Sequence, residues 1–145
     1  MIRVKFLSRR DPAGWGRYFP DSDGRWGGCR FLFDPAETRY DWLAVLDDLP
    51  TAPGQARQTA RATLHCPARQ TLLITTEPES IKTYGQGYCR QFGHILTSQP
   101  GWALRHPSRH EGHSGNHWFY GDRADQPMSR ERLLAGPDPA LKQDR

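Results

Sequence analysis

Hydrophobic positions in this chain gather in short segments that predict the strands of a sheet. Residues 2–7 place Ile, Val and Phe at alternate positions between Arg and Lys, which is typical of a strand buried on one face. Nearly continuous apolar runs at residues 40–46 and 71–76, each followed by turn-forming residues, predict central strands covered on both faces. Shorter runs at residues 29–33 and 94–97 complete a predicted sheet of about four or five strands.

Residues 77–92 predict the main helix of the chain. Pro78 falls in its first turn, Glu77 and Glu79 complement the helix dipole there, and apolar residues then recur at helical spacing. Strand, helix and strand across residues 71–97 form a βαβ unit, whose two strands are expected to be parallel with a right-handed crossover. The predicted fold class is therefore α/β, with a Rossmann-like, open and mostly parallel sheet.

The remaining segments carry no clear periodicity. Residues 8–28 are rich in Gly, Asp, Arg and aromatic side chains and predict a long loop, and residues 55–63 permit one short helix. From residue 101 onward the pattern fails. We therefore expect an α/β domain at residues 1–100, an irregular extension rich in His and aromatic side chains at 101–128, and a short helix with a linker-like tail at 129–145.

Composition narrows the class of protein. At 145 residues, 36% hydrophobic and 25% charged, the chain suits one packed domain. It contains no apolar run of membrane-spanning or signal-peptide type, and its three cysteines form no CxxC pair, so we expect a cytoplasmic protein with reduced thiols. The net charge is +4, but Arg9 and Arg10 form the only adjacent basic pair, which argues against a nucleic-acid partner.

Acidic residues follow several of the predicted strands. Ligands of open parallel sheets bind beyond the carboxyl ends of the strands, where Asp34, Asp47, Asp48 and Glu77 would lie. Glu77 stands at a strand-to-helix junction, from which its carboxylate could take a proton from a substrate hydroxyl. The alternative is that Glu77 caps the helix that follows. Asp47 and Asp48 are interpreted first as turn residues.

A histidine-rich stretch raises the question of a metal site. It contains His110, Glu111, His113 and His117. The spacing departs from the HExxH pattern of zinc proteases, and the Gly, Ser and Asn residues between the histidines disfavour a helix that would align them. The sequence therefore predicts a solvated loop and no metal site.

Aromatic side chains at Trp118, Phe119 and Tyr120 form a second candidate binding feature. They could stack on a sugar or a base, or they could form a small satellite core or an interface with a partner. Glycine-rich phosphate-binding motifs and a GxSxG nucleophile motif are missing from the sequence. We therefore expect no cofactor.

Several segments, taken together and in chain order, carry a resemblance to a known family. They are residues 29–35, 40–43, 47–50, 72–82, 92–99 and 118–121, of which the Thr-Thr-Glu-Pro and Leu-Thr-Ser-Gln stretches are the most specific. The chain resembles the amino-terminal half of bacterial proteins of glycosyltransferase family 10, the fucosyltransferase family. The stretch from 109 to 117 and the first loop depart from the family pattern.

This resemblance implies one half of a GT-B arrangement, in which two Rossmann-like halves face each other across a cleft. The family transfers fucose from GDP-fucose to a glycan hydroxyl with inversion, and the amino-terminal half lies on the acceptor side and supplies a glutamate as general base. Glu77 matches that glutamate, and Trp118, Phe119 and Tyr120 would contact the substrate. We expect GDP-fucose as a partner only if another chain supplies the donor-binding half. The resemblance therefore implies a truncated or split enzyme that is inactive alone. The alternative is a stand-alone α/β module that binds a glycan or a protein.

Overall fold

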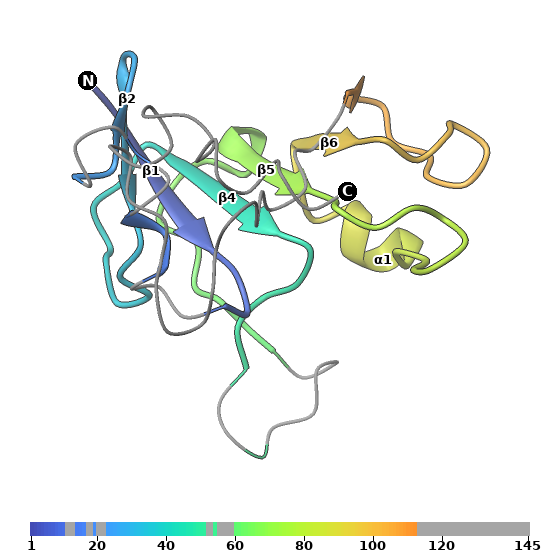
Figure 1. The fold of residues 1–145 in the computed structure, drawn as a ribbon, viewed down its shortest axis with the longest axis horizontal. Helices are drawn as coiled ribbons and strands as arrows, with labels where there is room; N and C mark the ends of the chain where they lie inside the picture. The colour runs from blue at the N-terminus through green and yellow to red at the C-terminus, as the bar shows by residue number, and fades with distance from the viewer. Residues whose placement is uncertain (11–13, 17–18, 20–22, 52–53, 55–59, 113–145) are drawn as a thin grey trace, which may run out of the picture.

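A computed structural model of the chain describes residues 1–10, 14–16, 19, 23–51, 54 and 60–112. Within these residues the dominant element is a seven-stranded sheet, in the order β2-β3-β1-β4-β5-β6-β7 (Figure 1). Its strands are β1 (Ile2–Leu7), β2 (Arg25–Trp26), β3 (Cys29–Leu32), β4 (Trp42–Leu46), β5 (Thr71–Ile74), β6 (His94–Thr97) and β7 (Arg109–Glu111). The helices described are the 3-10 turn η4 (Ala68–Gln70) and the one-turn α-helix α1 (Gln86–Cys89).

The sheet is parallel apart from one hairpin. β1 pairs in parallel with both β3 and β4, β4 to β7 continue in parallel, and only β2 and β3 run antiparallel. The prediction of an open, mostly parallel sheet is confirmed, and so is the parallel pairing of β5 with β6. The chain leaves β1 for β3 on one side and then crosses to β4 on the other, so the strand order reverses between β1 and β4. Open sheets bind their ligands at such a reversal.

The helix predicted over residues 77–92 is wrong for most of its length. Ile81 and Lys82 instead close a turn by donating their backbone N–H groups to the carbonyl of Pro78, both at 3.0 Å. Only the four residues of α1 are α-helical, and Ile81, expected on the buried face, is 71% exposed. Gly85 and Gly87 lower the helix propensity of this segment. In addition, the hydroxyl of the buried Tyr84 donates a hydrogen bond to Asp47, in the loop after β4.

Two strands lie where the sequence predicted loop. β7 adds a parallel strand to β6 within the extension predicted as irregular. β2 lies inside the predicted loop of residues 8–28 and forms a hairpin with β3. At Gly24, φ is +75° and a Cβ atom would lie 2.6 Å from the carbonyl oxygen of Phe31, so this entry to the hairpin requires glycine. Residues 60–63 are not helical, and the rest of the possible helix at 55–63 lies outside the described residues.

The core lies on one face of the sheet. Its strand residues occupy alternate positions, and the segment around α1 packs on them. The buried cluster contains Leu7, Tyr40, Leu43, Val45, Leu73, Tyr84, Cys89, Phe92, Ile95 and Leu104. The register places Lys5 and Leu7 of β1 on this core face. The sequence predicted that the opposite face of β1, with Ile2, would be the buried one. The reverse is found, because Lys5 is 5% exposed and Ile2 is 47% exposed.

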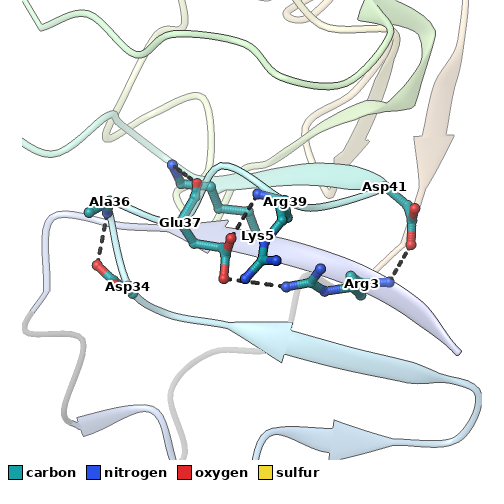
Figure 2. Close-up of polar contacts among 7 residues, drawn as sticks. All are labelled: Arg3, Lys5, Asp34, Ala36, Glu37, Arg39 and Asp41. Carbon is teal, nitrogen blue, oxygen red and sulfur yellow. Dashed lines mark hydrogen bonds and ion pairs between the residues drawn. The ribbon is translucent and has the colours of Figure 1, made fainter.

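The connection from β3 to β4 explains why a lysine is buried in β1. This connection runs past β1, and the Lys5 ammonium donates a hydrogen bond to the carbonyl of Pro35 at 2.7 Å. It donates a second one to the carbonyl of Glu37 at 2.9 Å (Figure 2). The Glu37 carboxylate in turn accepts from the Arg3 guanidinium at 3.3 Å and from the backbone N–H of Arg39 at 2.7 Å. Burial lowers the pKa of Lys5, and the nearby carboxylates of Asp34 and Glu37 oppose that shift. The connection between parallel strands is usually a helix that packs on the sheet. Here hydrogen bonds and an ion pair hold the connection from β3 to β4 against β1 instead.

Candidate functional site at the carboxyl edge of the sheet

Polar residues gather where three neighbouring strands end. Asp47 and Asp48 follow β4, Thr75 to Glu77 follow β5, and Gln99 lies two residues beyond β6. Because these strands are parallel, their carboxyl ends meet at one edge of the sheet. Asp47, Asp48 and Glu77 thus lie beyond strand ends, as predicted.

Asp47 is the centre of this polar network. Its φ of 59° places it in the left-handed region, which Asp tolerates better than most residues. Its carboxylate accepts hydrogen bonds from the backbone N–H of Thr76 at 2.8 Å, from the Thr76 hydroxyl and from the Tyr84 hydroxyl. Burial, together with the Asp47 carboxylate, raises the pKa of the Tyr84 phenol. Asp47 is a turn residue, as predicted, and it also ties β4 to β5 and to the segment before α1.

Gln99 holds the loop that contains Glu77. Its side chain is buried, with 1% of the residue exposed, and its amide donates to the backbone carbonyls of Glu77 at 2.8 Å and Lys82 at 2.9 Å. The backbone N–H of Gln99 donates to the Thr97 hydroxyl at 3.0 Å, and the hydroxyls of Thr75 and Thr97 are hydrogen-bonded at 2.6 Å. The loop backbone around Glu77 is therefore fixed from β6.

Glu77 itself is half-buried and lies three residues beyond the end of β5. Its carboxylate forms no hydrogen bond or ion pair with any other residue that the structure describes. The alternative prediction, that Glu77 caps the helix, is wrong: α1 begins at Gln86, with Gly85 as its N-cap and no side-chain cap. Among the described residues the carboxylate is therefore uncommitted, which leaves both of its oxygens available to accept a proton from a bound hydroxyl.

A groove of about 680 Å³ opens beside this network. Its lining combines charged groups with aromatic rings and includes Asp48, Leu49, Arg61, Lys82, Tyr84 and Tyr88. The Lys82 ammonium lies 2.7 Å from the Asp48 carboxylate and 4.6 Å from the centre of the Tyr84 ring. Glu77 does not line the groove, although Gln99 joins its backbone to that of Lys82.

Tyr88 lines the groove, but its hydroxyl group is buried. That hydroxyl has no hydrogen-bond partner among the described residues. Burial raises the pKa of this phenol, and the Asp48 carboxylate adds to the shift. Sequence reasoning missed Lys82 and Tyr88, because both were placed on a continuous helix. The pairing of Lys82 with Asp48 joins residues 34 positions apart, and no local pattern marks it.

Other sequence candidates lie elsewhere. Trp118, Phe119 and Tyr120 lie outside the described residues, as do His113 and His117. His110 and Glu111 belong to β7. In the parts of the chain that the structure describes, no group of three or more His, Cys, Asp or Glu side chains is arranged to hold a metal ion. None of the helices in those parts is long and apolar enough to cross a membrane.

Comparisons with known proteins add no relative to these observations. No family model, no curated protein and no solved structure matches the chain.

Proposed function

We propose that this chain is the acceptor-binding half of an inverting glycosyltransferase that transfers fucose from GDP-fucose to a glycan hydroxyl. The observation that carries the proposal is Glu77, whose carboxylate has no partner among the described residues while its backbone carbonyl is held by Gln99. Its position after β5, at the carboxyl edge of a parallel sheet, is where α/β enzymes place reacting groups. The sequence resemblance to glycosyltransferase family 10 supplies the reaction.

In this mechanism Glu77 is the general base. It takes the proton of the acceptor hydroxyl while that oxygen forms a bond to the anomeric carbon of fucose. The bond from this carbon to the phosphate oxygen breaks on the opposite side, and GDP leaves with the electron pair. No covalent sugar–enzyme intermediate forms, so one carboxylate suffices on the acceptor side.

The adjacent groove supports acceptor binding. A glycan presents hydroxyls that both donate and accept hydrogen bonds, together with apolar ring faces that pack on aromatic rings. The Asp48–Lys82 pair offers an acceptor and a donor, and Tyr84 and Tyr88 offer rings. In this proposal the donor nucleotide binds to a second half that another chain supplies, and no cofactor takes part.

The second candidate is a stand-alone α/β module that binds a glycan or a protein without catalysis. One observation favours it: the groove combines charged groups with aromatic rings, and Glu77, the candidate general base, does not line it. Titration of the 145-residue chain with oligosaccharides, followed by tryptophan fluorescence, separates the two candidates. Micromolar binding that persists without any donor-binding half, and with no turnover in its presence, favours the module.

The catalytic proposal is tested by Glu77→Gln, with Glu79→Gln as the matched control two residues away. Each variant is mixed with the donor-binding half of a family 10 protein, a glycan acceptor and GDP-fucose, and released GDP is measured. We expect the Glu77 variant to lose about 10²–10⁴-fold in turnover, because a general base contributes that much, and the control to stay close to the parent.

Two results would contradict the proposal. Equal turnover by the parent and the Glu77→Gln variant, with unchanged circular dichroism, would remove Glu77 from the mechanism. Release of GDP by the 145-residue chain without a second half would show that donor binding does not need one.

A further inference from the structure

Two histidines meet on the less buried face of the sheet, away from the carboxyl-edge network. His94 is the first residue of β6, and His110 lies in the middle of β7. The register pairs Leu96 with His110, and His94 is two residues before Leu96, so both imidazoles project from the same face. His94 Nδ1 and His110 Nε2 lie 3.2 Å apart.

Ser108 completes a triangle of donor atoms. Its hydroxyl oxygen lies 2.7 Å from His94 Nδ1 and 3.3 Å from His110 Nε2. The carbonyl of Ser108 accepts the backbone N–H of Ile95 at 3.0 Å, which fixes the start of β7 against β6. Two of the three potential ligand atoms therefore belong to a strand pair, and the third comes from the turn immediately before β7.

The separation of the two imidazole nitrogens matches the spacing of ligands around one ion. With metal–nitrogen bonds of about 2.0–2.1 Å, two imidazole nitrogens in a tetrahedral site stand about 3.3 Å apart. His110 is exposed and His94 half-buried, so an ion and its remaining water ligands have access from solvent. Glu111 projects from the other face and pairs with Arg109 at 3.1 Å, so its carboxylate is not part of the triangle.

We propose that His94 and His110, with the Ser108 hydroxyl beside them, form an open binding site for a divalent transition-metal ion. Imidazole ligands suit Cu²⁺, Ni²⁺ and Zn²⁺, and Cu²⁺ binds most tightly to a given set of nitrogen donors. Water completes the coordination shell, because the described residues offer only two imidazoles. This site differs from the one considered in the sequence, where His110 was grouped with His113 and His117, since its second ligand comes from β6.

Trp42 provides a local reporter for this site. Its ring centre lies 5.6 Å from that of His94, so Cu²⁺ bound by His94 would quench its fluorescence. The chain contains five tryptophans, and a Trp42→Phe variant identifies the share of the signal that comes from this one.

The test is titration of the untagged 145-residue chain with CuCl₂, NiCl₂ and ZnCl₂, followed by calorimetry and fluorescence. We expect saturable binding, strongest for Cu²⁺, and an electron paramagnetic resonance spectrum of Cu²⁺ with nitrogen ligands. His94→Ala and His110→Ala should each weaken binding about tenfold or more, because each removes one of two strong donors. His65→Ala, at an exposed histidine outside the cluster, should leave the affinity unchanged.

Three outcomes would overturn the proposal. One is the absence of saturable Cu²⁺ binding, which would leave the three residues as a hydrogen-bonded cluster. Another is unchanged affinity in a folded His94→Ala variant. The third is a loss of binding in His113→Ala or His117→Ala but not in His94→Ala, which would assign the ion to the histidine-rich stretch instead.

Discussion

Two charged side chains with opposite signs fasten loops to this sheet. Lys5, in the middle of β1, donates to two backbone carbonyls of the connection between β3 and β4, of which Figure 2 shows that of Glu37. Asp47, just beyond β4, accepts from Thr76 and Tyr84. In both regions, hydrogen bonds to one charged side chain hold a loop that no long helix packs against.

The two regions differ in what they leave available. Around Lys5 the carboxylate of Glu37 is used by Arg3 and Arg39, so the charged groups largely satisfy one another. Around Asp47 the neighbouring Glu77 carboxylate and Tyr88 hydroxyl have no partner among the described residues. Lys5 and Asp47 therefore hold loops through similar contacts. Only the region around Asp47 also contains polar groups without a partner among the described residues, and these groups distinguish the candidate site.

Replacement of Asp47 should have the largest effect on stability. Asp47→Ala leaves the buried Tyr84 hydroxyl and the Thr76 N–H without their acceptor, and it places Ala at a positive φ. We expect the free energy of unfolding to fall by about 3 kcal/mol, measured by urea denaturation. Asp48→Ala, which removes a partly exposed ion pair with Lys82, should cost less than about 1 kcal/mol. Equal losses in the two variants would contradict the central role of Asp47.

Replacement of Lys5 should have a smaller effect. Lys5→Met keeps the length of the side chain but removes the donor to Pro35 and Glu37, and we expect a loss of about 1–2 kcal/mol in the free energy of unfolding. Arg3→Met, on the same face of β1, is the control and should cost less than about 1 kcal/mol, since its ion pair with Glu37 is partly exposed. A stabilised Lys5→Met variant would show that the buried ammonium is a net burden.

The smallest predicted effect is a difference in the response to alkali. The pKa of Tyr84 is raised in the folded state, so the unfolded chain loses this proton first. The stability that Tyr84 contributes is therefore present below the ordinary phenol pKa of 10.0 and falls as the pH rises above it. The pKa of Lys5 is lowered, so its contribution to stability rises with pH up to its ordinary value of 10.5.

Urea midpoints measured between pH 8 and pH 11 test these opposite signs. Tyr84→Phe should lower stability at pH 8, because a hydrogen bond to Asp47 is lost, and should reduce the decline above pH 10. A decline above pH 10 that is as steep in the Tyr84→Phe variant as in the parent would contradict the assignment to Tyr84.

The sequence predicted the strands better than the connections between them. β1, β3, β4, β5 and β6 all lie within segments chosen from apolar patterning, because burial of a strand imposes that pattern directly. β7 has the sequence Arg-His-Glu and carries no such signal; its parallel pairing with β6 defines it. The helix over residues 77–92 was mispredicted because Tyr84 is apolar enough to fit a helical stripe, whereas its hydroxyl is bound by Asp47.

For the candidate site, local sequence could locate Glu77 but not its surroundings. Its place after a buried strand is visible in the sequence, as are the two aspartates after β4. Gln99 and Lys82 act through contacts across 17 to 34 residues of chain, such as Gln99 with Glu77 and Lys82 with Asp48, and such pairings depend on the tertiary fold. Tyr88 reaches the same groove from α1. The groove follows from those pairings.

The place of β1 between β3 and β4 has a consequence for how the chain folds during synthesis. β1 is synthesised before the strands on both of its sides: Lys5 pairs with Leu32, and Leu7 with Val45. On the ribosome, β1 therefore has no neighbour in the sheet until β3 has emerged, and it lacks its second neighbour until β4 has emerged. Because these pairings are distant in sequence, contact order should make folding slow, and β1 is exposed to aggregation or to chaperones until they form.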